Sequence, residues 1–185
     1  MRIAIIGYSG SGKSTLAARL GTVFQAEVLH FDRVQFLPGW EIRSQEDKER
    51  ITKEFLDSHD SWVIDGNYSK LFYERRMAEA DLIIMVLFNK LSCLWRVVLR
   101  YIKYKNRTRP DMGEGCNEKL DREFIGWVLH GQRTRKAKER YAQVYARYKE
   151  KTIIVKNQRQ LDGCLRKLEQ WAITGTAWEG RQARQ

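Results

Sequence analysis

One short segment near the N-terminus constrains this chain more than any other feature. Residues 7–14 read Gly-Tyr-Ser-Gly-Ser-Gly-Lys-Ser and match the pattern G-x-x-x-x-G-K-[ST] at every fixed position. The segment follows a β-branched run and precedes apolar residues at helical spacing, Leu16, Leu20 and Phe24. A glycine-rich turn between a strand and a helix directs backbone N–H groups and the positive end of the helix dipole at phosphates. We therefore expect a nucleoside triphosphate site here.

The residues of this loop have separate expected roles. In a loop of this kind, Lys13 reaches the β- and γ-phosphates and the Ser14 hydroxyl binds Mg²⁺. The expected cofactors are therefore ATP, or another nucleoside triphosphate, and Mg²⁺. The expected nucleotide-binding residues are Gly7, Tyr8, Ser9, Gly10, Ser11, Gly12, Lys13, Ser14 and Thr15.

Strand and helix patterns alternate along the rest of the chain. Short apolar runs predict strands at 2–6, 28–30, 62–64, 82–88 and 152–155. Helical spacing predicts helices at 13–24, 44–58, 91–105, 121–148 and 158–171, with Ser44 as the cap of the second. This alternation is typical of a three-layer α/β domain with a parallel sheet and helices on both faces.

Length and composition favour one globular domain. The chain has 185 residues, of which 43% are hydrophobic and 31% charged, as in folded proteins. We expect one domain over residues 1–173 and a loose tail over 174–185, where no periodicity is visible. The longest apolar run, residues 82–88, is too short to span a bilayer. Cys93, Cys116 and Cys164 form no disulfide or zinc pattern, so a cytoplasmic protein without a membrane partner is expected, its oligomeric state open.

A carboxylate at the end of another strand completes the expected magnesium site. Asp65 directly follows the apolar run 62–64, at the sheet edge where ligands bind in open α/β sheets. Mg²⁺ keeps several of its waters when bound to protein, so an acidic residue is needed to orient them. Because Gly66 follows, an ordinary Asp-Gly turn is the alternative.

Four motifs in combination resemble the bacterial DNA topology modulation protein family. They are the glycine-rich loop with its preceding strand, His30-Phe31-Asp32, residues 62–68 (Trp-Val-Ile-Asp-Gly-Asn-Tyr) and residues 107–116 (Arg-Thr-Arg-Pro-Asp-Met-Gly-Glu-Gly-Cys). The match spans about residues 1–156. That family is similar to the adenylate kinase and shikimate kinase branch of P-loop proteins. The resemblance implies a five-stranded parallel sheet of order 2-3-1-4-5 with a small lid segment.

The resemblance also implies residues for an acceptor. Asp65 takes the magnesium-water role of the Asp-Gly pair in nucleoside monophosphate kinases, but Asn67 and Tyr68 replace the arginine that follows there, which argues against a nucleotide acceptor. Asp32 resembles the acidic residue near the acceptor hydroxyl in shikimate-kinase-like enzymes and would orient that hydroxyl or take its proton; a turn or cap role is the alternative. The expected acceptor-binding residues are Asp32, Asn67, Tyr68 and Trp40, the last from the aromatic loop 36–40. His30 is interpreted as a packed or surface histidine.

Arginines supply the cations that phosphoryl transfer requires. The loop 106–117, interrupted by proline and glycines, is predicted to be a mobile lid of about residues 106–120, and Arg109-Pro110 resembles the Arg-Pro of the shikimate kinase lid. One helical face leading into it carries Arg96, Arg100, Lys103 and Arg107; a solvated face is the alternative. The expected catalytic residues are Lys13, Asp32, Arg109, Arg107 and Arg100. Arg133, Lys136 and Arg140 are interpreted as a surface stripe, although Arg133 or Arg135 could also close on the phosphates.

Two functions remain on these grounds. The first is an ATP-dependent phosphotransferase that acts on a small-molecule acceptor. The second is a nucleotide-dependent nucleic-acid-binding protein, because a formal net charge of +11 attracts phosphate-bearing partners of any size. The chain lacks helix-turn-helix and zinc patterns, so the phosphotransferase is favoured.

Overall fold

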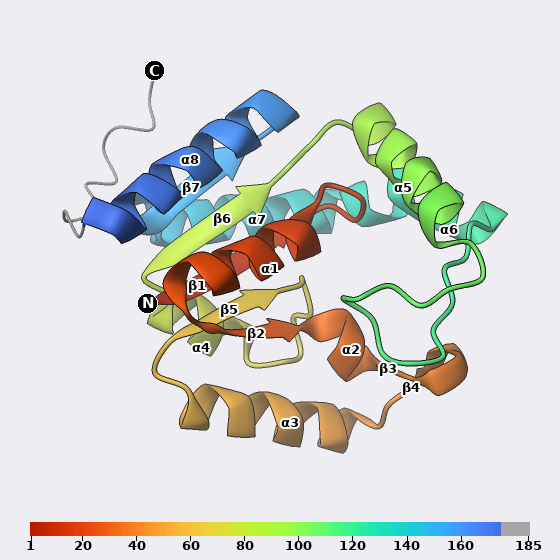
Figure 1. Ribbon diagram of the computed structural model, residues 1–185, viewed down its shortest axis with the longest axis horizontal. Coiled ribbons are helices and arrows are strands. Elements are labelled where there is room, and N and C mark those ends of the chain that lie inside the picture. Colours follow the sequence, from red (N-terminus) through yellow and green to blue (C-terminus); the bar gives the residue numbers. More distant parts are fainter. Residues whose placement is uncertain (175–185) are drawn as a thin grey trace.

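The computed structural model describes residues 1–174, which form three layers of helix, sheet and helix (Figure 1). Five parallel strands make the sheet: β1 (Arg2–Gly7), β2 (Glu27–His30), β5 (Trp62–Asp65), β6 (Leu82–Val86) and β7 (Thr152–Val155). They lie in the order β2-β5-β1-β6-β7. Counted along the chain, this is the predicted order 2-3-1-4-5. The predicted tail begins at Thr174, and residues 175–185 lie outside the described part of the chain.

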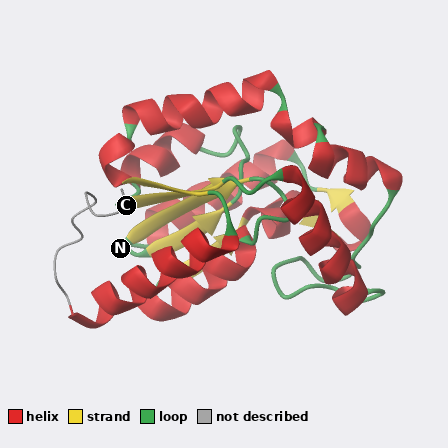
Figure 2. Cartoon of the chain, turned by 90° about the horizontal axis from the view of Figure 1, so that it is seen from above, coloured by secondary structure: helices red, strands yellow, loops and turns green. Residues whose placement is uncertain are grey.

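The strands are largely apolar because helices cover both faces of the sheet (Figure 2). Every residue from Ile3 to Ile6 and from Leu82 to Val86 is buried. In the parallel register, Ile5 pairs with Asp65 and His30 pairs with Asp65 from the other side. The carboxyl ends of β1, β2 and β5 therefore meet at one edge of the sheet.

Four of the predicted helices are present. They are α1 (Lys13–Phe24), α3 (Gln45–Ser58), α5 (Lys90–Tyr104) and α8 (Gln158–Thr174). Ser44 caps α3 as predicted, since its hydroxyl accepts a hydrogen bond from the Asp47 backbone N–H at 3.1 Å. Within residues 1–174, no helix combines the length and the apolarity needed to cross a bilayer.

The prediction of one helix over 121–148 is wrong. The segment forms α6 (Arg122–Leu129), a 3₁₀ turn (Gly131–Arg133) and α7 (Arg135–Arg147). A second N-cap causes the break, because the Thr134 hydroxyl accepts a hydrogen bond from the Ala137 backbone N–H at 3.3 Å. The turn between the helices points back toward the glycine-rich loop.

The sequence patterns missed several short elements. The helix α2 (Phe31–Gln35) begins directly after β2, and α4 (Tyr73–Glu79) precedes β6. The aromatic loop is a small hairpin, in which β3 (Phe36–Leu37) pairs with β4 (Glu41–Ile42) around the turn Pro38–Trp40. These elements are too short to show a clear period.

Candidate active site

The glycine-rich loop has the backbone geometry that phosphate binding needs. Gly12 has φ 95° and caps α1 without any side-chain hydrogen bond, so the N–H groups of the first helical turn are left for a ligand. At Gly7, where φ is 141°, an added Cβ would lie 2.2 Å from the Val86 carbonyl oxygen; only glycine fits. The Tyr8 ring is buried against Tyr141 with 5.6 Å between ring centroids, so Tyr8 offers this site only its backbone.

Lys13 and Ser14 lie at the start of α1 and face the end of β5. The Lys13 ammonium donates to the Tyr8 carbonyl at 2.9 Å. Burial lowers the pKa of Lys13, and the charges of Asp65 and Asp32 oppose this shift. The Ser14 hydroxyl donates to Asp65 Oδ2 at 2.8 Å. A bound triphosphate would replace the carbonyl as the partner of the Lys13 ammonium.

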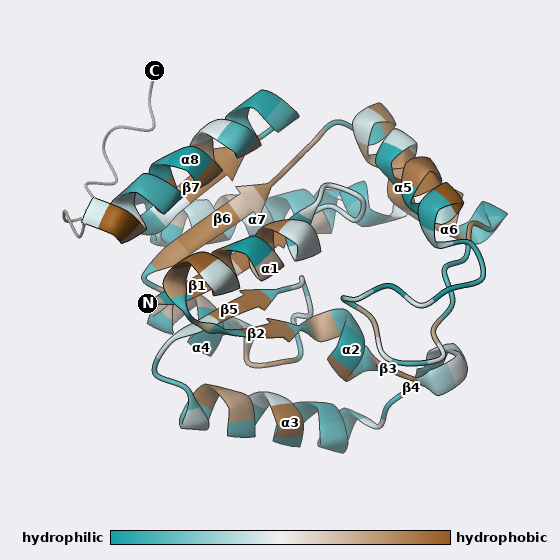
Figure 3. Cartoon of the chain, in the orientation of Figure 1, coloured by the Kyte–Doolittle hydropathy of each residue, from teal (hydrophilic) through white to brown (hydrophobic). Residues whose placement is uncertain are grey.

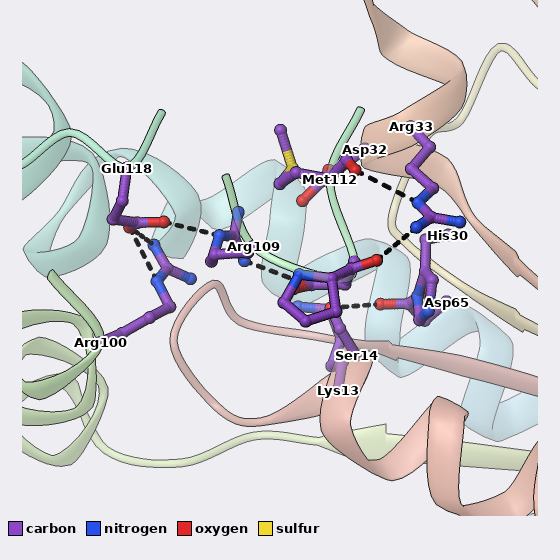
Figure 4. Close-up of polar contacts among 12 residues, drawn as sticks. Lys13, Ser14, His30, Asp32, Arg33, Asp65, Arg100, Arg109, Met112 and Glu118 are labelled. Carbon is purple, nitrogen blue, oxygen red and sulfur yellow. Dashed lines mark hydrogen bonds and ion pairs between the residues drawn. The ribbon is translucent and has the colours of Figure 1, made fainter. Parts of the chain in front are cut away.

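Asp65 joins the loop to His30 (Figure 4). Asp65 is buried, and its Oδ1 lies 2.5 Å from His30 Nδ1. Burial by itself lowers the pKa of His30, but the hydrogen bond and the charge of Asp65 outweigh it and raise that pKa. His30 is thus buried, and its ring holds the carboxylate that faces Ser14.

The oxygen atoms of Ser14 and Asp65 suit Mg²⁺, a hard cation. Among residues 1–174, no group of three or more His, Cys, Asp and Glu side chains is placed to hold a metal ion. Magnesium bound here would therefore take its remaining ligands from phosphate and water, as magnesium in nucleotide sites usually does.

The loop after β5 contributes Asn67 and Tyr68 in different ways. Tyr68 donates its hydroxyl to Asp32 Oδ1 at 2.7 Å, and burial, with the nearby charge of Asp32, raises the pKa of Tyr68. Asn67 lines the same pocket, but its amide is bonded to the Gly7 backbone, accepting from the N–H at 2.9 Å and donating to the carbonyl at 2.6 Å. Asn67 thus supports the glycine-rich loop, and its expected contact with an acceptor stays a prediction.

A buried arginine on α4 holds the loop after β5 through hydrogen bonds to its backbone. Arg76 donates to the carbonyls of Leu71 at 2.9 Å, Tyr68 at 2.8 Å and Gly66 at 3.3 Å. Burial lowers its pKa to about 9, and its guanidinium lies 4.3 Å from the Phe31 ring centroid. Sequence reasoning missed Arg76, since an arginine in a short helix carries no distinguishing pattern.

Arg100 and Arg109 share one carboxylate (Figure 4). Arg109 Nε lies 2.6 Å from Glu118 Oε2, and Arg100 Nη2 lies 2.7 Å from Glu118 Oε1. Arg109 also pairs with Asp111 at 2.8 Å. Burial lowers the pKa of Arg100, as does the charge of Arg109, although Glu118 acts against both. The sequence did not reveal Glu118, because it lies outside the motif of residues 107–116.

The predicted lid contacts the hairpin and α2. The Trp40 indole N–H donates to the Asn117 carbonyl at 2.9 Å, and Cys116 Sγ lies 3.2 Å from the Leu37 carbonyl oxygen. Arg33 donates to the carbonyls of Pro110 and Met112. Trp40 thus lies where it was expected, at the larger pocket, but its indole N–H is bonded to the lid.

The 3₁₀ turn between α6 and α7 covers the glycine-rich loop. Gln132 accepts a hydrogen bond from the Ser9 N–H, and its amide donates to the Ser9 carbonyl at 3.4 Å. The Arg133 guanidinium lies 3.8 Å from the Tyr8 ring centroid and donates to the Phe88 carbonyl at 2.9 Å. The surface-stripe interpretation is therefore wrong for Arg133, whereas Arg135 is exposed and pairs with Glu139. The break that brings Gln132 here was not predicted.

Two pockets meet at the glycine-rich loop. The smaller, of about 330 Å³, is also lined by Thr15 and by Arg96 and Lys103 of α5. The larger, of about 1230 Å³, extends past Trp40 and Tyr68. The residues that line both are Ser9, Lys13, Ser14, Asp32, Arg100 and Arg109. Four of the five expected catalytic residues are in this shared set; the fifth, Arg107, is exposed and lines neither pocket.

Comparison with known proteins identifies the fold. No protein-family model matches the sequence, and no curated protein matches it. Among solved structures, shikimate kinase from Acinetobacter baumannii in complex with shikimate superposes with a TM-score of 0.55 and 16% identity over 95% of this chain and 94% of that one. Shikimate kinase from Bacteroides thetaiotaomicron gives 0.51 and 17% identity over 92% and 96%. The chain therefore has the P-loop fold of the shikimate kinases, as the sequence predicted.

Proposed function

We propose that this protein transfers the γ-phosphoryl group of ATP to a small-molecule acceptor. The observation that carries the proposal is the junction of the two pockets. Three cationic side chains, Lys13, Arg100 and Arg109, and one carboxylate, Asp32, line both pockets. A site with two adjoining pockets suits a donor and an acceptor, and cations at the junction suit the charge that develops during phosphoryl transfer.

The smaller pocket fits the triphosphate. The backbone N–H groups at the start of α1 and the Lys13 ammonium would bind phosphate oxygens, and Ser14 and Asp65 would hold Mg²⁺. When bound, Mg²⁺ neutralises phosphate charge and orients the group to be transferred. His30 fixes the orientation of Asp65 through its hydrogen bond, as outer-sphere partners of metal ligands do.

The larger pocket fits the acceptor. Asp32 lies on its wall beside Lys13, and the Tyr68 hydroxyl fixes one of its oxygens. The other oxygen of Asp32 orients an acceptor hydroxyl toward the γ-phosphate or takes its proton as the new bond to phosphorus forms. Phe36, Trp40 and Phe124 supply apolar wall and exclude water, which would otherwise compete as acceptor.

Arg100 and Arg109 supply positive charge to the transferring group. Both are held by Glu118, so the carboxylate positions them at the junction. Their charges matter most when the equatorial oxygens of the phosphoryl group are most negative. We propose Arg109 as the principal of the two, because the predicted lid carries it.

Membership of the DNA topology modulation protein family, which the sequence motifs suggest, is part of the proposal. The four motifs that resemble the DNA topology modulation protein family contribute residues to this site, among them Lys13, Asp32, Asp65 and Arg109. The acceptor, and the choice of ATP over another triphosphate, are to be found by experiment.

Calorimetric titration of Mg²⁺-ATP tests the nucleotide site. Lys13→Ala should lose most of the affinity while the protein stays folded, because Lys13 contributes charge at the pocket and not core packing. Lys156→Ala, which removes an exposed lysine outside both pockets, is the matched control and should bind as the unmodified protein does. Equal affinity of Lys13→Ala and the unmodified protein for Mg²⁺-ATP would contradict the assignment. In a separate measurement, salt-sensitive binding of a DNA duplex without ATP turnover would favour the nucleic-acid function.

A further inference from the structure

Helix α5 has two apolar faces, and only one of them is covered. Cys93 and Val97 are buried on the inner face. The outer face carries Leu91, Trp95, Leu99 and Ile102 at intervals of four, four and three residues, and their exposed fractions are 68%, 63%, 46% and 66%. We call these four residues the α5 stripe. Single exposed apolar residues are common, but a continuous row of large ones marks an interaction surface.

The α5 stripe lies at the periphery of the molecule. Figure 1 shows α5 at one end, beside α6 and away from the sheet, and Figure 3 shows hydrophobic residues along it. Within residues 1–174, the stripe is thus accessible to a large flat partner, and Leu99 at its edge also lines the smaller pocket.

The segment that carries the stripe is uniformly basic. Residues 82–110 include no Asp or Glu and seven Lys or Arg, namely Lys90, Arg96, Arg100, Lys103, Lys105, Arg107 and Arg109. Arg100 and Arg109 are paired with acidic residues from outside that segment. Lys90 and Lys103, in the first and last turns of α5, and Lys105 just after it are exposed. The chain as a whole has a formal net charge of +11, so a partner of negative charge is favoured.

We propose that the α5 stripe docks this protein on an anionic lipid bilayer surface. A helix that lies in the plane of a membrane interface buries Leu, Ile and Trp at the boundary of the acyl chains and keeps Lys near the headgroups. Trp95 is the residue type that prefers this boundary, and lysines near an anionic leaflet add electrostatic attraction. Binding of this kind occurs at the membrane surface and requires no transmembrane helix.

Two other partners fit the stripe less well. In a symmetric contact with a second copy, the exposed Lys90, Lys103 and Lys105 of one chain would lie near the same lysines of the other, without acidic residues from 82–110 to offset them. A nucleic acid would meet the lysines, but Leu91, Leu99 and Ile102 offer no group to phosphate, sugar or base edges.

Vesicle co-sedimentation tests the proposal on the full chain. Binding to phosphatidylglycerol vesicles should exceed binding to phosphatidylcholine vesicles by about tenfold or more, given the attraction of several lysines to the anionic surface. The combined variant Leu91→Ser, Trp95→Ser and Ile102→Ser should abolish the binding. The matched control combines Ile42→Ser with Ile173→Ser, which remove apolar residues of similar exposure elsewhere, and should bind normally. Lys90→Gln with Lys105→Gln should weaken binding only to the anionic vesicles.

The thermal unfolding midpoint of each variant shows whether it is folded. Docking on a bilayer does not depend on the proposed phosphotransferase function. Vesicle binding that is unchanged in the stripe variant, or equal for both lipids, would overturn the proposed docking. So would light scattering that shows a dimer for the unmodified protein and a monomer for the stripe variant, since a second copy would then cover the stripe. Loss of DNA binding in the stripe variant, without vesicle binding by the unmodified protein, would assign the stripe to nucleic acid instead.

Discussion

The glycine-rich loop and the predicted lid line the same pocket junction, but they are held in different ways. The glycine-rich loop continues from β1, and its backbone is bonded to β6, where Tyr8 N–H donates to the Val86 carbonyl, and to the side chains of Asn67 and Gln132. The lid instead contacts the hairpin, α2 and α5, through the side chains of Trp40, Arg33 and Arg100. We therefore expect the loop to be preformed for binding, and we expect the lid, whose bonds are to elements outside the sheet, to change its contacts when a ligand arrives.

The largest effect that separates the two regions is expected at Arg109. Arg109→Gln should lower the rate of ATP turnover by about 100-fold, and lower ATP affinity much less, because the charge acts mainly on the transition state. Arg107→Gln, two residues away and exposed, is the matched control and should have a small effect. Turnover by steady-state assay and affinity by calorimetry are compared. Equal losses in both variants would mean that the lid arginines act only through general charge.

Asp65 tests the expected magnesium site beside the glycine-rich loop. Asp65→Asn keeps hydrogen-bonding capacity toward His30 and Ser14 but removes the charge, so magnesium-dependent turnover should fall by about 30-fold. The thermal unfolding midpoint should change much less than turnover does. A titration of turnover against Mg²⁺ concentration is the measurement. A variant with normal magnesium dependence, or one that unfolds early, would favour the interpretation of Asp65 as an ordinary turn residue.

The loop half of the site was predictable from sequence because it is local. Lys13 and Ser14 are adjacent, and Asp65 ends an apolar strand whose neighbour in a parallel sheet could be inferred. Glu118 and Gln132 were not predictable, because they act on Arg100 and Ser9, which only the tertiary structure brings near. Arg76 acts on carbonyls close to it in sequence, but an arginine in a short helix carries no distinguishing pattern. Gln132 depends on the helix break before Thr134, which the apolar spacing of 121–148 conceals. The fold was recoverable because buried parallel strands read as continuous apolar runs.

Arg76 stabilises the loop after β5, next to the glycine-rich loop, through three backbone carbonyls. Arg76→Met should lower the free energy of unfolding by about 3 kcal/mol, since hydrogen bonds to charged groups are lost and buried carbonyls are left without partners. Arg75→Met, which changes a more exposed neighbour that pairs with Asp57 and Glu79, should cost about 1 kcal/mol or less. Urea denaturation measures both. Equal stability of the two variants would remove Arg76 as a support of the site.

The mobility of the lid is the subtlest expected difference. Amide hydrogen exchange in residues 106–117 should slow when a non-hydrolysable ATP analogue is added, because lids of this kind close over bound substrate. The last turns of helix α8, which contact Arg19 and Phe24 of α1 and line neither pocket, serve as an internal reference and should be unaffected. Unchanged exchange throughout 106–117 at saturating analogue would leave the segment as a static surface loop.

The products formed from ATP are the direct test of phosphoryl transfer to a small-molecule acceptor. The protein is incubated with Mg²⁺, ATP that carries ¹⁸O in its γ-phosphoryl group, and a mixture of small hydroxylated metabolites, and the products are analysed by mass spectrometry. We expect a new phosphorylated metabolite that carries the label, formed by the unmodified protein and absent with Lys13→Ala. Labelled inorganic phosphate as the sole product, or a labelled metabolite formed equally by Lys13→Ala, would contradict the proposed function.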